Sequence, residues 1–210
     1  MKVHSPKLKT ALMILLLFVV WTVLLRIIDV QPIGPHGSTV GFASLNRFFH
    51  NLTGVHMWLY TVTDWAGLVP AAFGFGFAAL GLVQWIKRKK IWKVDFATLV
   101  LGVFYFVVLT VYLFFEEFVI NYRPVLINGY LEASYPSSTT LLVLCVMPTA
   151  NMQLKRYVKG KFVAYAINAF TAFAVIGRLL SGVHWLTDII GGVILSAGLV
   201  MLYDAIVKAD

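Results

Sequence analysis

Six apolar segments dominate this sequence of 210 residues, and most are close to the roughly 20 residues with which a helix crosses a bilayer. The segments lie at about 12–30, 65–86, 96–115, 137–152, 161–179 and 185–207. Charged residues make up only 12% of the chain, against roughly 25% in a typical soluble protein. The sequence therefore predicts an all-α membrane protein, a six-transmembrane-helix bundle that forms a single integral membrane domain over residues 1–210. The first segment is too long for a cleaved signal and is expected to be a retained span.

A longer connection separates the first two apolar segments. Its start, QPIGPHGSTVG, has the proline and glycine density of a loop. Its later part, FASLNRFFHNLTGVHMWLY, mixes aromatic and polar residues, which favours an amphipathic helix lying in the membrane interface. The predicted bundle thus has an interfacial helix between the first two spans.

Basic residues alternate with the apolar segments, and this alternation predicts a topology. Clusters precede the first segment and follow the second, fourth and sixth: Lys2, Lys7 and Lys9; Lys87, Arg88, Lys89, Lys90 and Lys93; Lys155, Arg156, Lys159 and Lys161; and Lys208. Because lysine and arginine concentrate on the cytoplasmic side, we expect a multi-pass plasma-membrane protein with both termini in the cytoplasm. The clusters account for the net charge of +8 without a nucleic-acid partner.

The run GRLLSGVHWLTD carries three ionisable residues between two apolar segments. Ionisable groups are costly near a membrane and usually have a function. His184 and Asp188 are four apart, so on a helix they would share one face, and a carboxylate can orient an imidazole as a nucleophile or base. Arg178 would hold an anion beside them. These three residues alone are equally compatible with interfacial charges that only anchor a helix.

Two further segments fall on the same, extracytoplasmic side. EEFVINYRPVL places Arg123 just past the third span, and SYPSSTT places Ser137 at the start of the fourth. Free N–H groups at a helix N-terminus bind anions, although Ser137 also fits an ordinary helix cap. Two arginines, a helix N-terminus and a His–Asp pair together predict a phosphate site.

The chain resembles the membrane-bound type 2 phosphatidic acid phosphatases. That family has three motifs: Lys, six residues, Arg-Pro; Pro-Ser-Gly-His; and Ser-Arg, five residues, His, three residues, Asp. The matching positions in this chain are Arg123 and Pro124, Pro136 and Ser137, and Arg178, His184 and Asp188.

The resemblance implies a mechanism as well as a six-span fold with an outward active site. His184 would attack phosphorus and form a phosphohistidine, and Asp188 would orient its ring. The phosphoryl oxygens would be held by Arg123, Ser137 and Arg178. We expect no cofactor and no metal ion, and the oligomeric state is left open.

The chain also departs from the family pattern. Glu116 stands where the first motif has lysine, and Thr139 stands where the second has the histidine that protonates the leaving group. Losing a general acid typically costs about 100- to 10,000-fold in rate. Glu117, Glu132 and Tyr135 are candidate replacement proton donors.

The leading hypothesis is a membrane phosphatase for a lipid phosphate or diphosphate, acting on the outer face. A diphosphate such as undecaprenyl diphosphate has a better leaving group, so it would need the acid less. The alternative is a degenerate family member that binds a lipid phosphate without turnover.

Overall fold

The computed structural model describes residues 6–158 and 160–209, so the predicted cytoplasmic residues Lys2 and Lys159 lie outside it. The described chain is nearly all helical. Its helices are α1 (Pro6–Leu24), α2 (Ala43–Thr53), α3 (Met57–Ala66), α4 (Leu68–Arg88), α5 (Phe96–Glu117), α6 (Ser138–Leu154), α7 (Phe162–Leu180) and α8 (Leu186–Val207). Two short 3₁₀ turns, η1 (Pro35–Gly37) and η2 (Ile91–Lys93), lie in the connections.

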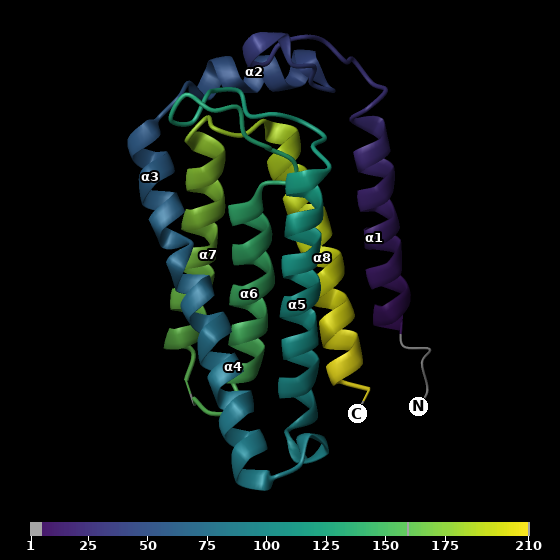
Figure 1. Cartoon of the computed structure of the whole chain (residues 1–210), viewed down its shortest axis with the longest axis vertical. Helices are drawn as coiled ribbons and strands as arrows, with labels where there is room; N and C mark the ends of the chain where they lie inside the picture. Colours follow the sequence, from purple (N-terminus) through teal and green to yellow (C-terminus); the bar gives the residue numbers. More distant parts are fainter. Residues whose placement is uncertain (1–5, 159, 210) are drawn as a thin grey trace.

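The long helices run along one axis and α2 lies across one end of them (Figure 1). This arrangement confirms the predicted all-α membrane fold. The crossing helix occupies part of the predicted interfacial segment. It buries Asn46, whose side-chain amide donates to Thr187 Oγ1 at 3.0 Å and so ties α2 to the start of α8. On the same helix Phe48 and Leu52 are exposed, as expected for an amphipathic helix.

Within the described residues, five helical segments are long and apolar enough to cross a membrane: α1, α3 with α4, α5, α7 and α8. The helix α6 corresponds to the fourth predicted span. It is shorter, at 17 residues, contains Pro148 and runs between the other helices with most of its residues buried (Figure 1). The second hydrophobic segment starts at Met57, earlier than the predicted residue 65. The sequence assigns the first turns of this segment to the interfacial helix because of their aromatic and polar mixture. In the structure the interfacial helix is α2, which ends before Gly54, a residue with a positive φ of 68°.

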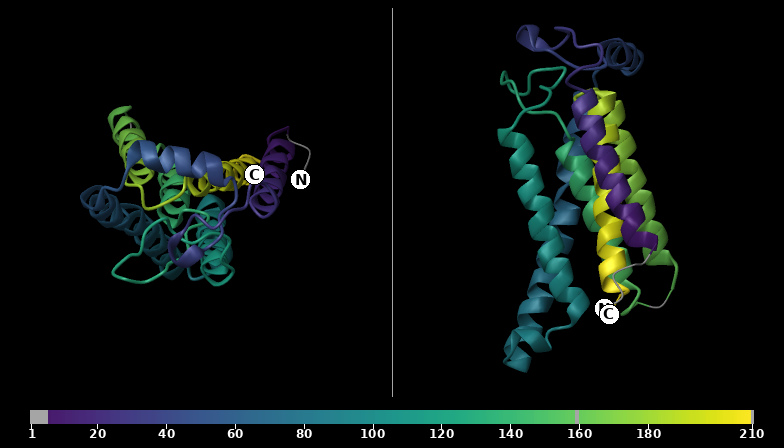
Figure 2. Two further views of the ribbon diagram at one scale, coloured as in Figure 1. Left: turned by 90° about the horizontal axis from the view of Figure 1, so that it is seen from above. Right: turned by 90° about the vertical axis from the view of Figure 1, so that its right-hand side faces the viewer.

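The core of the bundle forms around α8, on which α1, α5 and α6 pack (Figure 2). Glycines on α8 permit this close packing. A Cβ at Gly198 would lie 2.7 Å from a methyl group of Leu15 on α1, and one at Gly191 would lie 2.3 Å from the ring of Tyr135. The second contact brings the segment before α6 directly against the first turns of α8.

The two ends of the bundle differ in character. The start of α1 and the ends of α4, α6 and α8 share the end opposite α2 (Figures 1 and 2). There Asp204 pairs with Lys7 at 2.8 Å and with Lys208 at 2.6 Å, which joins the first and last helices. The predicted site residues Arg123, Ser137, Arg178, His184 and Asp188 lie at the other end, in the connections and in the helix turns next to them.

Candidate active site

The connection between α5 and α6 folds back on itself as an irregular hairpin. The backbone N–H of Arg123 donates to the carbonyl of Glu132 at 3.1 Å, and that of Ser134 donates to the carbonyl of Asn121 at 2.9 Å. The hairpin thereby presents side chains that are nine or more residues apart in sequence on one surface.

The connection between α7 and α8 lies against this hairpin and under the α2–α3 connection. Gly182 has a φ of 70°, and a Cβ there would lie 1.9 Å from the carbonyl oxygen of Gly54, so glycine is required. The backbone N–H of His56 donates to the carbonyl of Ser181 at 2.9 Å. These contacts fix the backbone that carries His184.

The imidazole of His184 is buried and its Nδ1 contacts Ser134 twice. Nδ1 lies 3.1 Å from the Ser134 carbonyl oxygen and 3.0 Å from the Ser134 hydroxyl oxygen. The hydroxyl in turn donates to Asp188 Oδ2 at 2.5 Å. Because a carbonyl can only accept, Nδ1 carries the proton, and Nε2 keeps its lone pair.

The carboxylate of Asp188 is therefore linked to His184 through Ser134. Asp188 also accepts from the amide of Asn121 at 3.0 Å and from the backbone N–H of Trp185 at 3.0 Å. Helical spacing predicted a direct His–Asp contact. However, His184 precedes α8, which begins at Leu186, while Asp188 caps the first turn of that helix. The two residues do not share a helical face, and a serine fills the space between them.

Three buried nitrogen atoms in this region have no hydrogen-bond partner among the described residues. They are Nε2 of His184, Nη1 of Arg123 and Nε of Arg178. Burial and the two nearby guanidinium groups lower the pKa of His184 well below its usual range, so its imidazole is neutral at neutral pH. A neutral nucleophilic nitrogen beside two unused cationic donors matches the needs of a phosphoryl group.

Both arginines lie close to one aromatic ring. The guanidinium carbon of Arg178 is 4.7 Å from the ring centroid of Tyr60, and that of Arg123 is 5.7 Å away. Arg178 also pairs with Asp64 at 3.0 Å, and Arg123 pairs with Glu132 at 3.2 Å. Both carboxylates are partly solvent-exposed, whereas both guanidinium groups are buried. The ring and the carboxylates hold the two cations near each other, and one nitrogen of each cation has no hydrogen-bond partner among the described residues.

Both arginines line a cavity of about 580 Å³ at the end of the bundle. Ser138 at the start of α6 lines it too, and the first N–H groups of a helix have no intrahelical partner. Ser137, the predicted phosphate ligand, is fully buried; its backbone N–H donates to the carbonyl of Asp188 and its hydroxyl accepts from Thr140. The structure therefore brings Arg123, Arg178 and Ser138 to the cavity and turns Ser137 toward α8. His184 and Asp188 are buried and do not line the cavity.

The candidate proton donors occupy different positions. Glu132 lines the cavity but is paired with Arg123, and Glu117 is exposed at the end of α5 and does not line it. The hydroxyl of Tyr135 lies 2.7 Å from that of Thr22 on α1, and burial raises the pKa of this phenol. Glu116 does line the cavity, and its carboxyl makes no hydrogen bond or ion pair with any described residue.

Sequence reasoning did not single out Ser134, Asn121 or Tyr60. Ser134 stands two residues before the proline of the second motif, and Asn121 two residues before the arginine of the first. Their proximity to motif residues was the available signal, but their roles depend on how the hairpin folds back. Tyr60 lies in a helix far from any motif, and no pattern in the sequence indicated it.

We expect Ser134→Ala to lower turnover by roughly 10- to 100-fold, the usual effect of removing a group that orients a histidine at a metal site. The Ser134 carbonyl would still hold Nδ1, so the tautomer is kept while the link to Asp188 is lost. Phosphate release measures the effect. The control is Ser196→Ala, which also removes a buried hydroxyl but lies on α8, away from His184 in sequence. Equal activities of the two variants would contradict the role of Ser134.

Comparisons with known proteins bear on the family pattern and on the fold. Residues 114–209 match the family model of the PAP2 superfamily, which confirms the resemblance predicted from the motifs. The fold is similar to that in the crystal structure of a transmembrane PAP2 type phosphatidylglycerolphosphate phosphatase from Bacillus subtilis. The TM-score is 0.62 at 18% sequence identity, covering 95% of this chain and 94% of that one. No curated protein matches the chain.

Proposed function

We propose that this membrane protein hydrolyses lipid phosphates or diphosphates through His184. The premise is that residues 114–209 match the PAP2 superfamily model. The family match and the fold support a phosphoric ester hydrolase. The observation that carries the mechanism is the unpartnered Nε2 of His184 together with the unpartnered nitrogens of Arg123 and Arg178.

In the first step Nε2 of His184 attacks phosphorus and a P–N bond forms. The bond between phosphorus and the leaving-group oxygen breaks, releasing the lipid alcohol from a monophosphate or the lipid monophosphate from a diphosphate. Nδ1 keeps its proton, and the positive charge on the ring is stabilised through Ser134 by Asp188. Arg123 and Arg178 neutralise the phosphoryl oxygens. Water then attacks the phosphohistidine, the P–N bond breaks and inorganic phosphate leaves.

The leaving-group oxygen of a monophosphate needs a proton, and Thr139 at the family's histidine position cannot supply one at neutral pH. Glu116 is the better donor, because it lines the cavity without a partner and an incoming phosphate favours the protonated form of a nearby carboxyl. This assignment adds Glu116 to the donors predicted from the sequence, of which Glu132 is engaged by Arg123.

We expect Glu116→Gln to slow hydrolysis of a lipid monophosphate by about 100- to 10,000-fold, the usual cost of losing a general acid. Hydrolysis of a diphosphate should change only a few-fold, because phosphate is a good leaving group. Both rates are measured with the same tail, with Glu117→Gln as control. Equal losses on both substrates would contradict the role of Glu116 as proton donor.

The proposal places the site on the extracytoplasmic side and both termini in the cytoplasm of the plasma membrane. It is supported by the separation of the basic clusters from the site, since the ends of α4, α6 and α8 lie opposite α2 (Figure 1). Undecaprenyl diphosphate, an extracytoplasmic lipid diphosphate, is the substrate we propose to test first.

Phosphate release from vesicles containing a lipid monophosphate or a lipid diphosphate tests the function. Release from either lipid, without added metal, is the expected result. Glu116 and Thr139 at two functional family positions favour a second candidate, a protein that binds lipid phosphate without turnover. Retention of the lipid with no phosphate release would establish that alternative and reject the first.

A further inference from the structure

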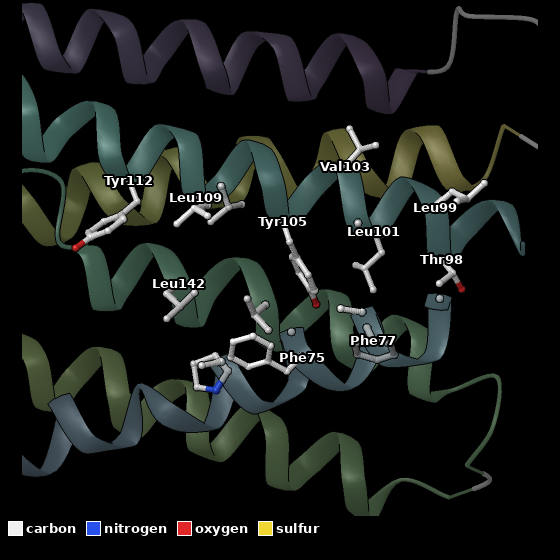
Figure 3. A pocket seen from close by; sticks show the side chains of 18 of the residues that line it. Phe75, Phe77, Thr98, Leu99, Leu101, Val103, Tyr105, Leu109, Tyr112 and Leu142 are labelled. Carbon is white, nitrogen blue, oxygen red and sulfur yellow. The ribbon is translucent and has the colours of Figure 1, made fainter. Parts of the chain in front are cut away.

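A second, apolar cavity of about 970 Å³ runs down the bundle between α4, α5 and the outer half of α6 (Figure 3). Tyr112, Leu109, Tyr105 and Leu101 follow one another along α5, and Phe75 and Phe77 come from α4. Leu101 and Val108 are buried and form its floor, whereas Phe75 and Val103 are exposed at its rim. It is therefore a groove that opens sideways toward the lipid.

The groove is continuous with the cavity of about 580 Å³ that Arg123 and Arg178 line, called here the phosphate cavity. Asp64, Tyr112 and Ser138 line both. Ser138 begins α6, Tyr112 lies in the outer part of α5, and Asp64 lies near the end of α3. Asp64 pairs with Arg178, so the upper end of the groove begins beside a guanidinium group of the candidate active site. A ligand with its phosphate on the arginines would have its apolar part directed into this groove.

The length of the groove indicates the kind of ligand. From Tyr112 to Thr98 on α5 it extends 14 residues, or about 21 Å at ~1.5 Å per residue. Half of the hydrocarbon core of a bilayer measures about 15 Å. A groove of this length that starts at the outer interface would continue past the bilayer centre, farther than a tail confined to one leaflet requires.

We infer that this groove holds the apolar tail of the lipid whose phosphate the arginines bind, and that it favours tails long enough to pass the bilayer centre. The inference rests on the proposed function, because it takes the phosphate site as the anchor. It names the substrate class as long-tailed lipid phosphates or diphosphates.

Two glycines give a way to block the groove without disturbing its walls. Gly74 on α4 and Gly102 on α5 line it, and a Cβ built on either meets no atom within 4 Å. Each lies ten residues from the upper end, about 15 Å below Asp64 or Tyr112. Leucine is also a better helix former than glycine, so Gly74→Leu and Gly102→Leu should fold.

The chain supplies a matched control. Gly76 lies two residues from Gly74 on the same helix and also has open space around it, but it lines a different, shallow hollow on the outside of the bundle and not the groove. Gly76→Leu therefore adds the same side chain to α4 without entering the groove.

The experiment measures kcat/KM in detergent for a series of lipid monophosphates or diphosphates with one head group and increasing tail length. For the wild type we expect kcat/KM to increase with tail length, and to go on increasing for tails longer than about 15 Å. Both groove variants should lose at least about tenfold on the long tails and be unchanged on the short ones, because each methylene kept out of the groove forfeits apolar burial. Gly76→Leu should match the wild type throughout.

Retention of the same lipids on the purified variants provides a readout independent of turnover. Tail-dependent retention that Gly74→Leu and Gly102→Leu reduce, with no phosphate release by any variant, would support the groove and reject the phosphatase. Turnover that none of the three variants alters would reject the groove and leave the phosphatase. A loss equal for all tail lengths, accompanied by a change in oligomeric state on size exclusion, would show that the groove is a contact between copies and overturn the inference.

Discussion

Replacing His184 with glutamine is expected to abolish phosphate release, with a loss of at least about 10,000-fold, because the nucleophile and everything that acts through it are removed together. Among residues 6–158 and 160–209, His184 is the only histidine that combines an unpartnered ring nitrogen with two nearby guanidinium groups. The readouts are phosphate release and covalent labelling. A substrate carrying labelled phosphorus should label the wild type with the acid-labile, base-stable behaviour of phosphohistidine, and should not label His184→Gln.

His36→Gln provides the control for this substitution. His36 is exposed in the connection between α1 and α2, so the same chemical change there should leave both readouts intact. Release that continues in His184→Gln at a tenth of the wild-type rate or more would refute nucleophilic catalysis by this residue, whatever else the site does.

Replacing Arg178 with alanine is expected to cost about 1,000- to 100,000-fold in kcat/KM, the range found for arginines that stabilise a transferring phosphoryl group. The guanidinium group is buried, and its Nε has no partner in the described structure and therefore remains available to a phosphoryl oxygen. Arg178→Lys should recover part of the loss, since it keeps the charge and loses the fork of donors.

Asp64→Asn separates this role from a structural one. If Arg178 served only to pair with Asp64, breaking the pair from either side would have the same effect. We expect Asp64→Asn to cost far less, because its carboxylate is 56% exposed and leaves the guanidinium charge in place. Arg47→Ala removes an exposed cation from α2 and controls for the overall positive charge of this face. Similar losses for Arg178→Ala and Asp64→Asn would contradict phosphate binding.

The sequence predicted the membrane class and the positions of the long helices because a helix in contact with lipid must be composed of apolar residues. A span must be apolar over about 20 residues whatever its neighbours are. The start of α3 was misplaced because Trp58, Tyr60 and Asp64 look interfacial in a linear reading, yet two of them face the buried Arg178. Placing these residues in the helix that begins at Met57 requires knowing that Tyr60 and Asp64 contact Arg178.

The motif residues were identifiable by their spacing, but the connections among them were not. Four residues separate His184 from Asp188, and the helical interpretation failed only because α8 begins between them. Likewise, whether Ser137 or Ser138 faces the cavity depends on a rotation of about 100° at the start of α6, which the pattern Pro-Ser-Ser leaves open.

The placement of two buried guanidinium groups at one tyrosine ring has a consequence for the end of the proposed reaction cycle. Two cations kept apart from water repel each other, and the exposed carboxylates of Asp64 and Glu132 offset only part of that repulsion. A phosphoryl group relieves the repulsion on arrival, but inorganic phosphate relieves it equally after the lipid has gone. In the proposed mechanism, the arrangement that captures the substrate also retains the product, and the escape of phosphate into water is a step with its own barrier.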